Sequence, residues 1–308
     1  VFGHVIRLKP ARSTDWTSAR PAVPRHRRVG RQLVAMEEIC CYSQGEKPML
    51  YTIPMSHYCE AARWALELAG IDFVEAAYLP GLHAAFSPIV DLRKGSKAPP
   101  GLTGSESSVP LLVSVDKEII AHDSWECMSR LGDAPPLRAK ELLDTIIGPC
   151  ARTIAYSHLL ADEGDAAFLK ACTPAKVPWM QRWAMASSPF RWKVKAALRE
   201  GLVRSQGHVE DCRTRLRTAL TEFEAFLYMP PYADAGPTVA AVALASLMAP
   251  LVLPPNYAVT FYEGPMLEME DLPPAMREEV AAWRNTPVGA WTLEYYKAHR
   301  RPDPEMSC

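Results

Sequence analysis

The segment Met49–Glu60, with the sequence MLYTIPMSHYCE, constrains the fold of this chain more than any other. A short apolar strand, Leu50–Ile53, is followed by a turn, and a helix is predicted from about His57 to Ala69. Ser56 and Cys59 therefore lie where the helix begins. Free backbone N–H groups and the helix dipole favour an anion at that position. Because a thiolate is such an anion, the segment predicts a protein that handles thiols.

A compact α/β unit is predicted around this segment, over residues 49–132. Gly70 is expected to end the first helix, and residues 82–108 contain a short helix at most. Further strands are expected at Phe73–Leu79, Val109–Val113 and Glu118–Ala121. The last helix, through Leu131, follows them, so the order of elements is βαβ-α-ββα.

Two local features of this unit bear on ligand binding. Asp123 is a good N-cap for the last helix, and Glu126, three residues later, completes a capping box. Pro110 fits best at a strand start, with the Val109–Pro110 bond in the cis form. A cis bond there would turn the N–H and C=O of Val109 outward, toward an extended peptide ligand.

Four motifs occur in order over about 85 residues: SHYCEAARWAL at 56–66, PGLH at 80–83, SVPLL at 108–112 and DSWE at 123–126. Together they resemble the thioredoxin-like N-terminal domain of glutathione transferases, most of all bacterial-type members with Ser-His-Tyr-Cys and Pro-Gly-Leu-His motifs. The resemblance implies a thioredoxin-like N-terminal domain followed by an all-α C-terminal domain. It also implies a transferase that binds glutathione as co-substrate, needs no metal, and forms a homodimer.

The resemblance assigns a role to each matching residue. Ser56 matches the hydroxyl that hydrogen-bonds the glutathione sulfur, and Val109, ahead of Pro110, matches the residue whose backbone pairs with the cysteinyl unit. Asp123 and Ser124 match the pair that holds the γ-glutamyl end. The expected chemistry is attack of the bound thiolate on a small apolar electrophile, since a free thiol with a pKa of ~8.5 is only slightly ionised at neutral pH.

Several alternatives stay open for these residues. Ser56 is also an ordinary helix cap, and Cys59 is either a buried helix cysteine or a resolving thiol, although Ser56 occupies the position of its redox partner. His83 is a loop histidine or a ligand contact. Lys97 is a solvated charge or a partner of the glycine carboxylate. The rival functions are a non-catalytic binding module of the same fold and a thiol oxidoreductase that depends on Cys59.

The remainder of the chain, residues 137–300, shows helical periodicity and no convincing strand. A helix over Leu137–Asp162 is expected to be broken or bent near Gly148–Pro149. An apolar stripe runs over Val209–Leu227, and Val239–Leu253 is apolar all round, as in a central buried helix. A further helix is expected at Ala275–Asn285, and residues 301–308 form a tail.

The stretch 163–207 is unusually basic and rich in tryptophan. Trp179, Trp183 and Trp192 alternate with basic residues, namely Arg182, Arg191, Lys193 and Lys195. Three interpretations stay open: a wall of the electrophile pocket, a contact with an anionic surface, or an amphipathic helix pair with a solvated basic face.

Composition sets limits on compartment and partners. The net charge of −1 argues against a nucleic-acid partner, and no apolar run is long enough to span a bilayer, so no membrane partner is expected. Eight cysteines without paired spacing fit reduced thiols and a cytoplasmic location. Residues 1–36 hold seven arginines and one lysine against one aspartate, and residues 1–48 are therefore expected to be a disordered leader or an organelle transit peptide.

Overall fold

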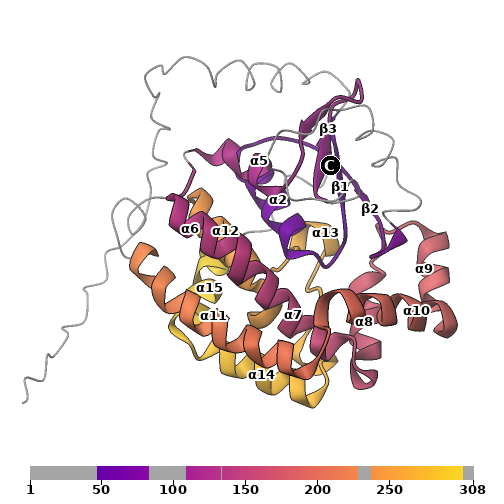
Figure 1. Ribbon diagram of the computed structural model, residues 1–308. Coiled ribbons are helices and arrows are strands. Elements are labelled where there is room, and N and C mark those ends of the chain that lie inside the picture. Colours follow the sequence, from indigo (N-terminus) through magenta and orange to yellow (C-terminus); the bar gives the residue numbers. More distant parts are fainter. Residues whose placement is uncertain (1–46, 83–108, 133, 228–236, 301–308) are drawn as a thin grey trace, which may run out of the picture. The chain divides into compact units, whose positions relative to one another are not determined.

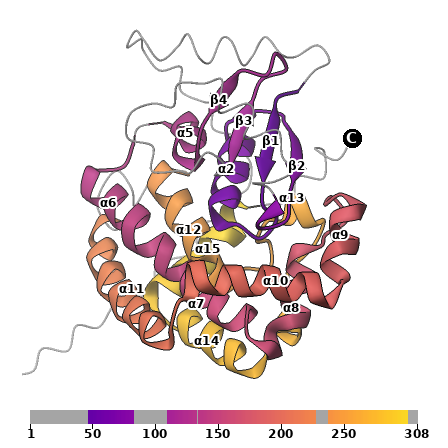
Figure 2. The ribbon, with the colours of Figure 1, turned by 45° about the vertical axis from the view of Figure 1, so that its right-hand side comes forward.

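The computed structural model describes residues 47–82, 109–132, 134–227 and 237–300 (Figures 1 and 2). His83, Lys97, the expected short helix between residues 82 and 108, and nearly all of the predicted leader lie outside these ranges. The tail 301–308 lies outside them as well.

The N-terminal part is built on a four-stranded mixed sheet with the strand order β2-β1-β3-β4. The central strand β1 (Met49–Thr52) pairs in parallel with β2 (Val74–Ala77) and antiparallel with β3 (Leu111–Val113). Strand β4 (Ile119–Ala121) pairs antiparallel with β3. Helix α2 (His57–Leu68) crosses over between the parallel strands, and α5 (Ser124–Met128) follows β4. The predicted thioredoxin-like fold class, an α/β unit followed by helices, is therefore confirmed.

All further elements of the described chain are helical. Their bounds are α6 (Leu137–Leu142), α7 (Gly148–Leu159), α8 (Asp165–Cys172), α9 (Trp179–Ala186), α10 (Ser188–Leu198), α11 (Gln206–Leu227), α12 (Val239–Val252), α13 (Val259–Tyr262), α14 (Pro274–Arg284) and α15 (Pro287–His299). Short 3₁₀ turns lie at Ser129–Leu131, Asp162–Gly164 and Met269–Asp271, and a π-helical stretch follows α10 at Arg199–Val203.

The expected break or bend near Gly148–Pro149 is a local irregularity in a continuous helix. A π-helical stretch, Leu143–Ile147, joins α6 to α7 without interrupting the helix. Pro149 follows this stretch directly and, having no N–H, cannot donate to a carbonyl of the preceding turn. The absence of a side chain at Gly148 matters here, because a Cβ atom would lie 2.5 Å from the Tyr58 hydroxyl of α2.

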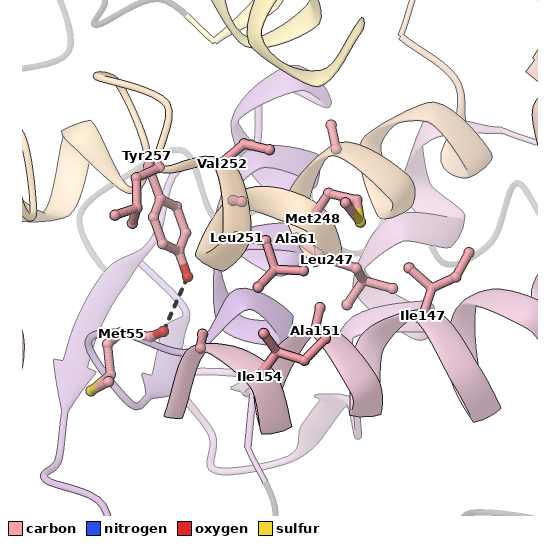
Figure 3. Packing of buried hydrophobic residues seen from close by; sticks show 14 of the residues in the cluster. Met55, Ala61, Ile147, Ala151, Ile154, Leu247, Met248, Leu251, Val252 and Tyr257 are labelled. Atoms are coloured by element: carbon pink, nitrogen blue, oxygen red, sulfur yellow. Dashed lines mark hydrogen bonds between the residues drawn. The ribbon is translucent and has the colours of Figure 1, made fainter. Parts of the chain in front are cut away.

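Helix α12 is the centre of the core, as its uniformly apolar sequence predicts. Every residue of it is buried, and it packs against α2, α7, α14 and α15. Figure 3 shows side chains of α12 between Ala61 of α2 and Ala151 of α7. The two parts of the described chain therefore share one apolar core. Thr238 caps α12 by accepting the Ala241 N–H at 3.2 Å.

A buried ionic network ties α2 to the end of the chain. Arg300, which follows α15 and is 1% exposed, donates from Nε to Glu60 of α2 at 2.9 Å and also binds Glu67. Arg63, one turn after Glu60, pairs with Glu75 of β2 at 2.7 Å. Burial acts to lower the pKa of Arg63, but the Glu75 carboxylate outweighs it and holds the guanidinium charged. Paired charges of this kind are costly to bury and strongly destabilising when one partner is removed.

We expect Arg300→Ala to lower the free energy of unfolding by about 3–5 kcal/mol, because it leaves the fully buried Glu60 carboxylate without its main partner. Chemical denaturation measures the change. Lys297→Ala is the matched control, since that side chain is 79% exposed and 4.0 Å from Glu294, and it should change stability by less than about 0.5 kcal/mol. A loss below about 1 kcal/mol for Arg300→Ala would contradict the central role of the network.

Candidate functional site

The sheet register brings the candidate residues to one edge. Strand β1 ends at Thr52, four residues before Ser56, and the antiparallel register Tyr51↔Leu111 places the start of β3 beside that end. Val109 lies two residues before β3 and, continuing the register, faces Ile53. Strand β4 runs antiparallel to β3, so its end, Ala121, also lies at this edge. Asp123 and Ser124 follow it directly. Ser56, Val109, Pro110, Asp123 and Ser124 therefore gather at the same edge of the sheet.

Ser56 is the N-cap of α2. Its backbone is extended, and its hydroxyl oxygen accepts the Cys59 N–H at 3.4 Å. The side chain is half-buried, and its hydroxyl also lies within hydrogen-bonding reach of the Cys59 sulfur. A hydroxyl can donate one hydrogen bond while it accepts another. The cap therefore leaves a donor available beside the start of the helix, and the structural and catalytic interpretations of Ser56 are compatible.

The turn that carries Ser56 is fixed from both sides. The Arg63 guanidinium donates to the carbonyls of Ile53 and Pro54, each at 3.4 Å. From the other side, the Tyr257 hydroxyl donates to the Met55 carbonyl at 3.0 Å (Figure 3). Side chains from α2 and from the segment after α12 thus hold consecutive backbone carbonyls of the turn.

Cys59 lies beneath this turn, away from solvent. It is fully buried, and its sulfur accepts the Ile53 N–H at 3.4 Å. Burial raises the pKa of the thiol, although Arg63 and the Ser56 hydroxyl act in the opposite direction. A reactive cysteine needs exposure and a lowered pKa. The structure therefore favours the buried helix cysteine over the resolving thiol.

Asp123 caps α5 as predicted, by accepting the Glu126 N–H at 2.8 Å. The second hydrogen bond of the expected capping box, from the Asp123 N–H to the Glu126 carboxylate, is replaced. The Glu126 carboxylate accepts the N–H of His122 instead, at 2.6 Å. Burial raises the pKa of Asp123 above its ordinary value. Ser124 beside it is 5% exposed. The Val109–Pro110 bond is cis, as expected.

Three residues that the sequence analysis did not single out lie next to Ser56. His57 is 2% exposed, its Nε2 has no partner among the described residues, and its ring lies 4.3 Å from that of Tyr58. The Arg152 guanidinium of α7 lies 5.8 Å from the centre of the Tyr58 ring and forms no ion pair with a described residue. The sequence does indicate that Arg152 has no ion-pair partner on its own helix, because no acidic residue lies three or four positions from it on α7.

His57 is not a base for the thiol at neutral pH. Burial lowers the pKa of His57 to about 3, and the nearby Arg152 charge lowers it further. A hydrogen bond with the Gly148 backbone raises the pKa but does not offset these two effects. The ring is therefore neutral at physiological pH. Burial likewise raises the pKa of Tyr58 to about 12, so that its hydroxyl stays protonated. This side of the turn offers neutral polar groups and one positive charge, that of Arg152.

The described residues hold no cluster of three or more groups that could bind a metal ion. Two cavities lined by described residues lie away from the Ser56 edge. One, of about 350 Å³, is bounded by α10 residues such as Trp192 and Arg191; the other, of about 440 Å³, lies around Asn256 and Leu293. Neither includes a candidate site residue.

Cys59 is expected to resist alkylation in the native protein, because its sulfur is buried and its pKa is raised. Mass spectrometry of peptides after treatment with N-ethylmaleimide measures labelling cysteine by cysteine. Cys59 should label only in denaturant, at a rate then equal to that of other unfolded cysteines. Rapid labelling of Cys59 in the native protein would instead favour the oxidoreductase alternative.

Comparisons with known proteins find similarity only to solved structures: no family model matches the chain, and no curated protein does. A glutathione transferase from Phanerochaete chrysosporium is 15% identical, with a TM-score of 0.47, over 84% of this chain and 99% of that one. A beta-etherase from Sphingobium sp. strain SYK-6 is 15% identical, with a TM-score of 0.42, over 80% and 99%. A glutathione S-transferase from Methylobacillus flagellatus, with glutathione bound, is 14% identical, with a TM-score of 0.35, over 80% and 98%. Scores of this size carry no information about substrate or mechanism, so function has to be inferred from the chain's own residues.

Proposed function

We propose that this protein binds glutathione at the edge of the sheet where α2 begins and activates its thiol for transfer to a small electrophile. The observation that carries the proposal is the position of Ser56. Its hydroxyl caps α2 through its oxygen and still has a proton to donate. A thiolate placed there would accept that proton in a hydrogen bond and lie at the positive end of the helix dipole.

The chemistry follows from the ionisation of the thiol. Free glutathione is mostly protonated at neutral pH, since an ordinary thiol has a pKa of ~8.5. A hydrogen bond from Ser56 and the start of α2 favour the ionised form, which is the nucleophile. The thiolate then attacks the electrophilic atom of the second substrate, whose leaving group departs with the bonding electron pair. The lost thiol proton passes to solvent, because His57 stays neutral and is too weak a base at this pH.

The other end of the tripeptide is assigned to Asp123 and Ser124. The Asp123 carboxylate caps α5 by accepting the Glu126 N–H, and a carboxylate has further acceptor sites that we assign to the α-ammonium of the γ-glutamyl unit. The Ser124 hydroxyl, at the first position of α5, is assigned to the α-carboxylate. The backbone of Val109 is assigned to the cysteinyl unit between these two ends, as the family resemblance implies.

The rival functions fare differently against this geometry. A thiol oxidoreductase is disfavoured, because Cys59 is buried with a raised pKa. A binding module without turnover would use the same edge of the sheet, so only kinetics separates it from a transferase. Glutathione binding with no conjugation of any electrophile in a broad panel would favour the binding module.

Ser56→Ala is expected to lower kcat/KM for conjugation of an aromatic electrophile by about 10- to 100-fold, because one donor to an anion is lost. Loss of the cap alone costs roughly 1 kcal/mol of stability. Thr238→Ala is the matched control for that loss, since it removes an equivalent cap from α12 and should leave kcat/KM within about twofold.

Ser56→Asp separates the two roles of the residue further. An aspartate caps a helix as well as serine does, but it has no proton to donate when ionised and repels a thiolate. The variant should be as stable as the wild type and inactive. Full activity in either Ser56 variant would remove the hydroxyl from the mechanism.

The affinity for glutathione is expected to depend on pH through the ionisation of Asp123. Pairing with the ligand's ammonium requires the carboxylate, and burial raises the Asp123 pKa. Affinity should therefore be full above this raised pKa and fall as the pH decreases through it, at a higher pH than for an ordinary aspartate. Calorimetric titration across mildly acidic pH measures the effect.

The matched variants for this titration are Asp123→Asn and Asp116→Asn. Asp123→Asn should bind about tenfold more weakly, the loss of one charge-assisted hydrogen bond, with no pH dependence in this range. Asp116 lies in the exposed turn before β4, so Asp116→Asn should behave as the wild type. An unchanged affinity and pH profile in Asp123→Asn would exclude the assigned role.

A further inference from the structure

The outer face of α9 is an exposed aromatic patch, made of Trp179, Met180 and Trp183. Their exposed fractions are 68%, 62% and 74%. Trp183 lies four positions after Trp179 and three after Met180, and side chains at these spacings are neighbours on a helix, so the three form a continuous surface. Trp192 on the adjacent helix α10 is also exposed, at 69%. Apolar groups of this size rarely stay in water without a partner.

The patch does not result from a loosely attached helix. On its inner side α9 buries Met185 completely, and its Gln181 side chain accepts the N–H of Leu79, after β2, at 3.0 Å. The Arg191 guanidinium of α10 donates to the last carbonyls of α9, those of Met185 at 2.8 Å and Ala186 at 2.9 Å. The helix is thus docked through one face, and the tryptophans occupy the opposite one.

Basic residues outnumber acidic ones in the helices that carry the patch. Residues 166–199 contain seven lysines and arginines and no acidic residue, in a chain whose net charge is −1. Arg182 and Lys193, each adjacent in sequence to an exposed tryptophan, form no ion pair with any described residue. The other cations are mostly paired: Arg191 and Lys195 bind Asp165 at 2.9 and 3.0 Å, and Lys170 and Lys176 lie 2.7 and 3.5 Å from Asp271 and Glu263. The two unpaired cations beside exposed tryptophans favour an occupant that is anionic as well as apolar.

We propose that α9 and α10 dock on the surface of an anionic lipid bilayer. Tryptophan is enriched at the boundary between hydrocarbon and headgroups, where its ring is buried and its N–H stays hydrated. Lysine and arginine beside it pair with acidic headgroups. A surface contact of this kind needs no spanning helix, and the described residues contain no helix long and apolar enough to cross a membrane. Docking would deliver the catalytic edge to apolar electrophiles dissolved in the bilayer.

The experiment uses the full chain with vesicles of phosphatidylcholine, alone or with about one third phosphatidylserine. Sedimentation should show binding to the anionic vesicles only, weakening as ionic strength rises above about 0.1 M. Bromine-labelled lipid should quench tryptophan fluorescence, since Trp179 and Trp183 enter the interface. The double variant Trp179→Ser/Trp183→Ser should lose most of the binding, by about fivefold or more, and most of the quenching.

The controls separate the patch from other basic or apolar parts of the chain. Leu137→Ser removes an apolar side chain that is 84% exposed on α6 and should bind as the wild type. Lys193→Glu should weaken binding, whereas Lys297→Glu, at a similarly exposed site on α15, should not. This comparison matters because residues 1–36 carry a net charge of +7 and can attract acidic lipid themselves.

Three outcomes would overturn the proposal. The first is no sedimentation with anionic vesicles. The second is binding that the double tryptophan variant leaves unchanged, which would assign it to another part of the chain. The third is self-association without lipid that the double variant abolishes, which would make this face a contact between two copies. Conjugation activity of the double variant with a water-soluble electrophile should be unchanged, so the lipid proposal and the proposed function fail independently.

Discussion

The buried ionic network around the first turns of α2 is the interaction on which the rest of the structure depends. Glu60 and Arg63 come from the helix that Ser56 caps, Glu75 from the neighbouring strand, and Arg300 from the end of the described chain. Each charge is stable in the interior only because its partners are in place. The network therefore couples formation of the turn that carries Ser56 to completion of the C-terminal helices.

This coupling has a chemical consequence. Arg63 and Tyr257 hold the carbonyls of Ile53, Pro54 and Met55, so the Ser56 hydroxyl is positioned before any ligand arrives. A donor fixed in advance stabilises a developing anion without reorganisation at the moment of reaction. Cys59 helps to shape the same turn, as an acceptor for the Ile53 N–H, rather than acting as a nucleophile.

Local signals made much of the fold predictable, and long-range contacts account for what was missed. The cap at Ser56, the cis bond before Pro110 and the uniformly apolar α12 follow from neighbouring residues, and the structure confirms them. The meeting of His57 with Gly148 and Arg152, and of Arg300 with Glu60, joins residues far apart in sequence. The hydrophobic periodicity of a sequence carries no information about such long-range pairs. The irregularity near Gly148–Pro149 was expected from the Gly-Pro pair, but its π-helical form was not, because it accompanies the packing of Tyr58 against the glycine.

The central claim is that the start of α2 lowers the pKa of a bound thiol. An ultraviolet pH titration of thiolate absorbance, on the complex of the protein with glutathione, tests it most directly. The account predicts a pKa well below the ~8.5 of a free thiol in the wild type, and a return toward that value in Ser56→Ala. Saturated binding with an unshifted thiol pKa in the wild type would contradict it.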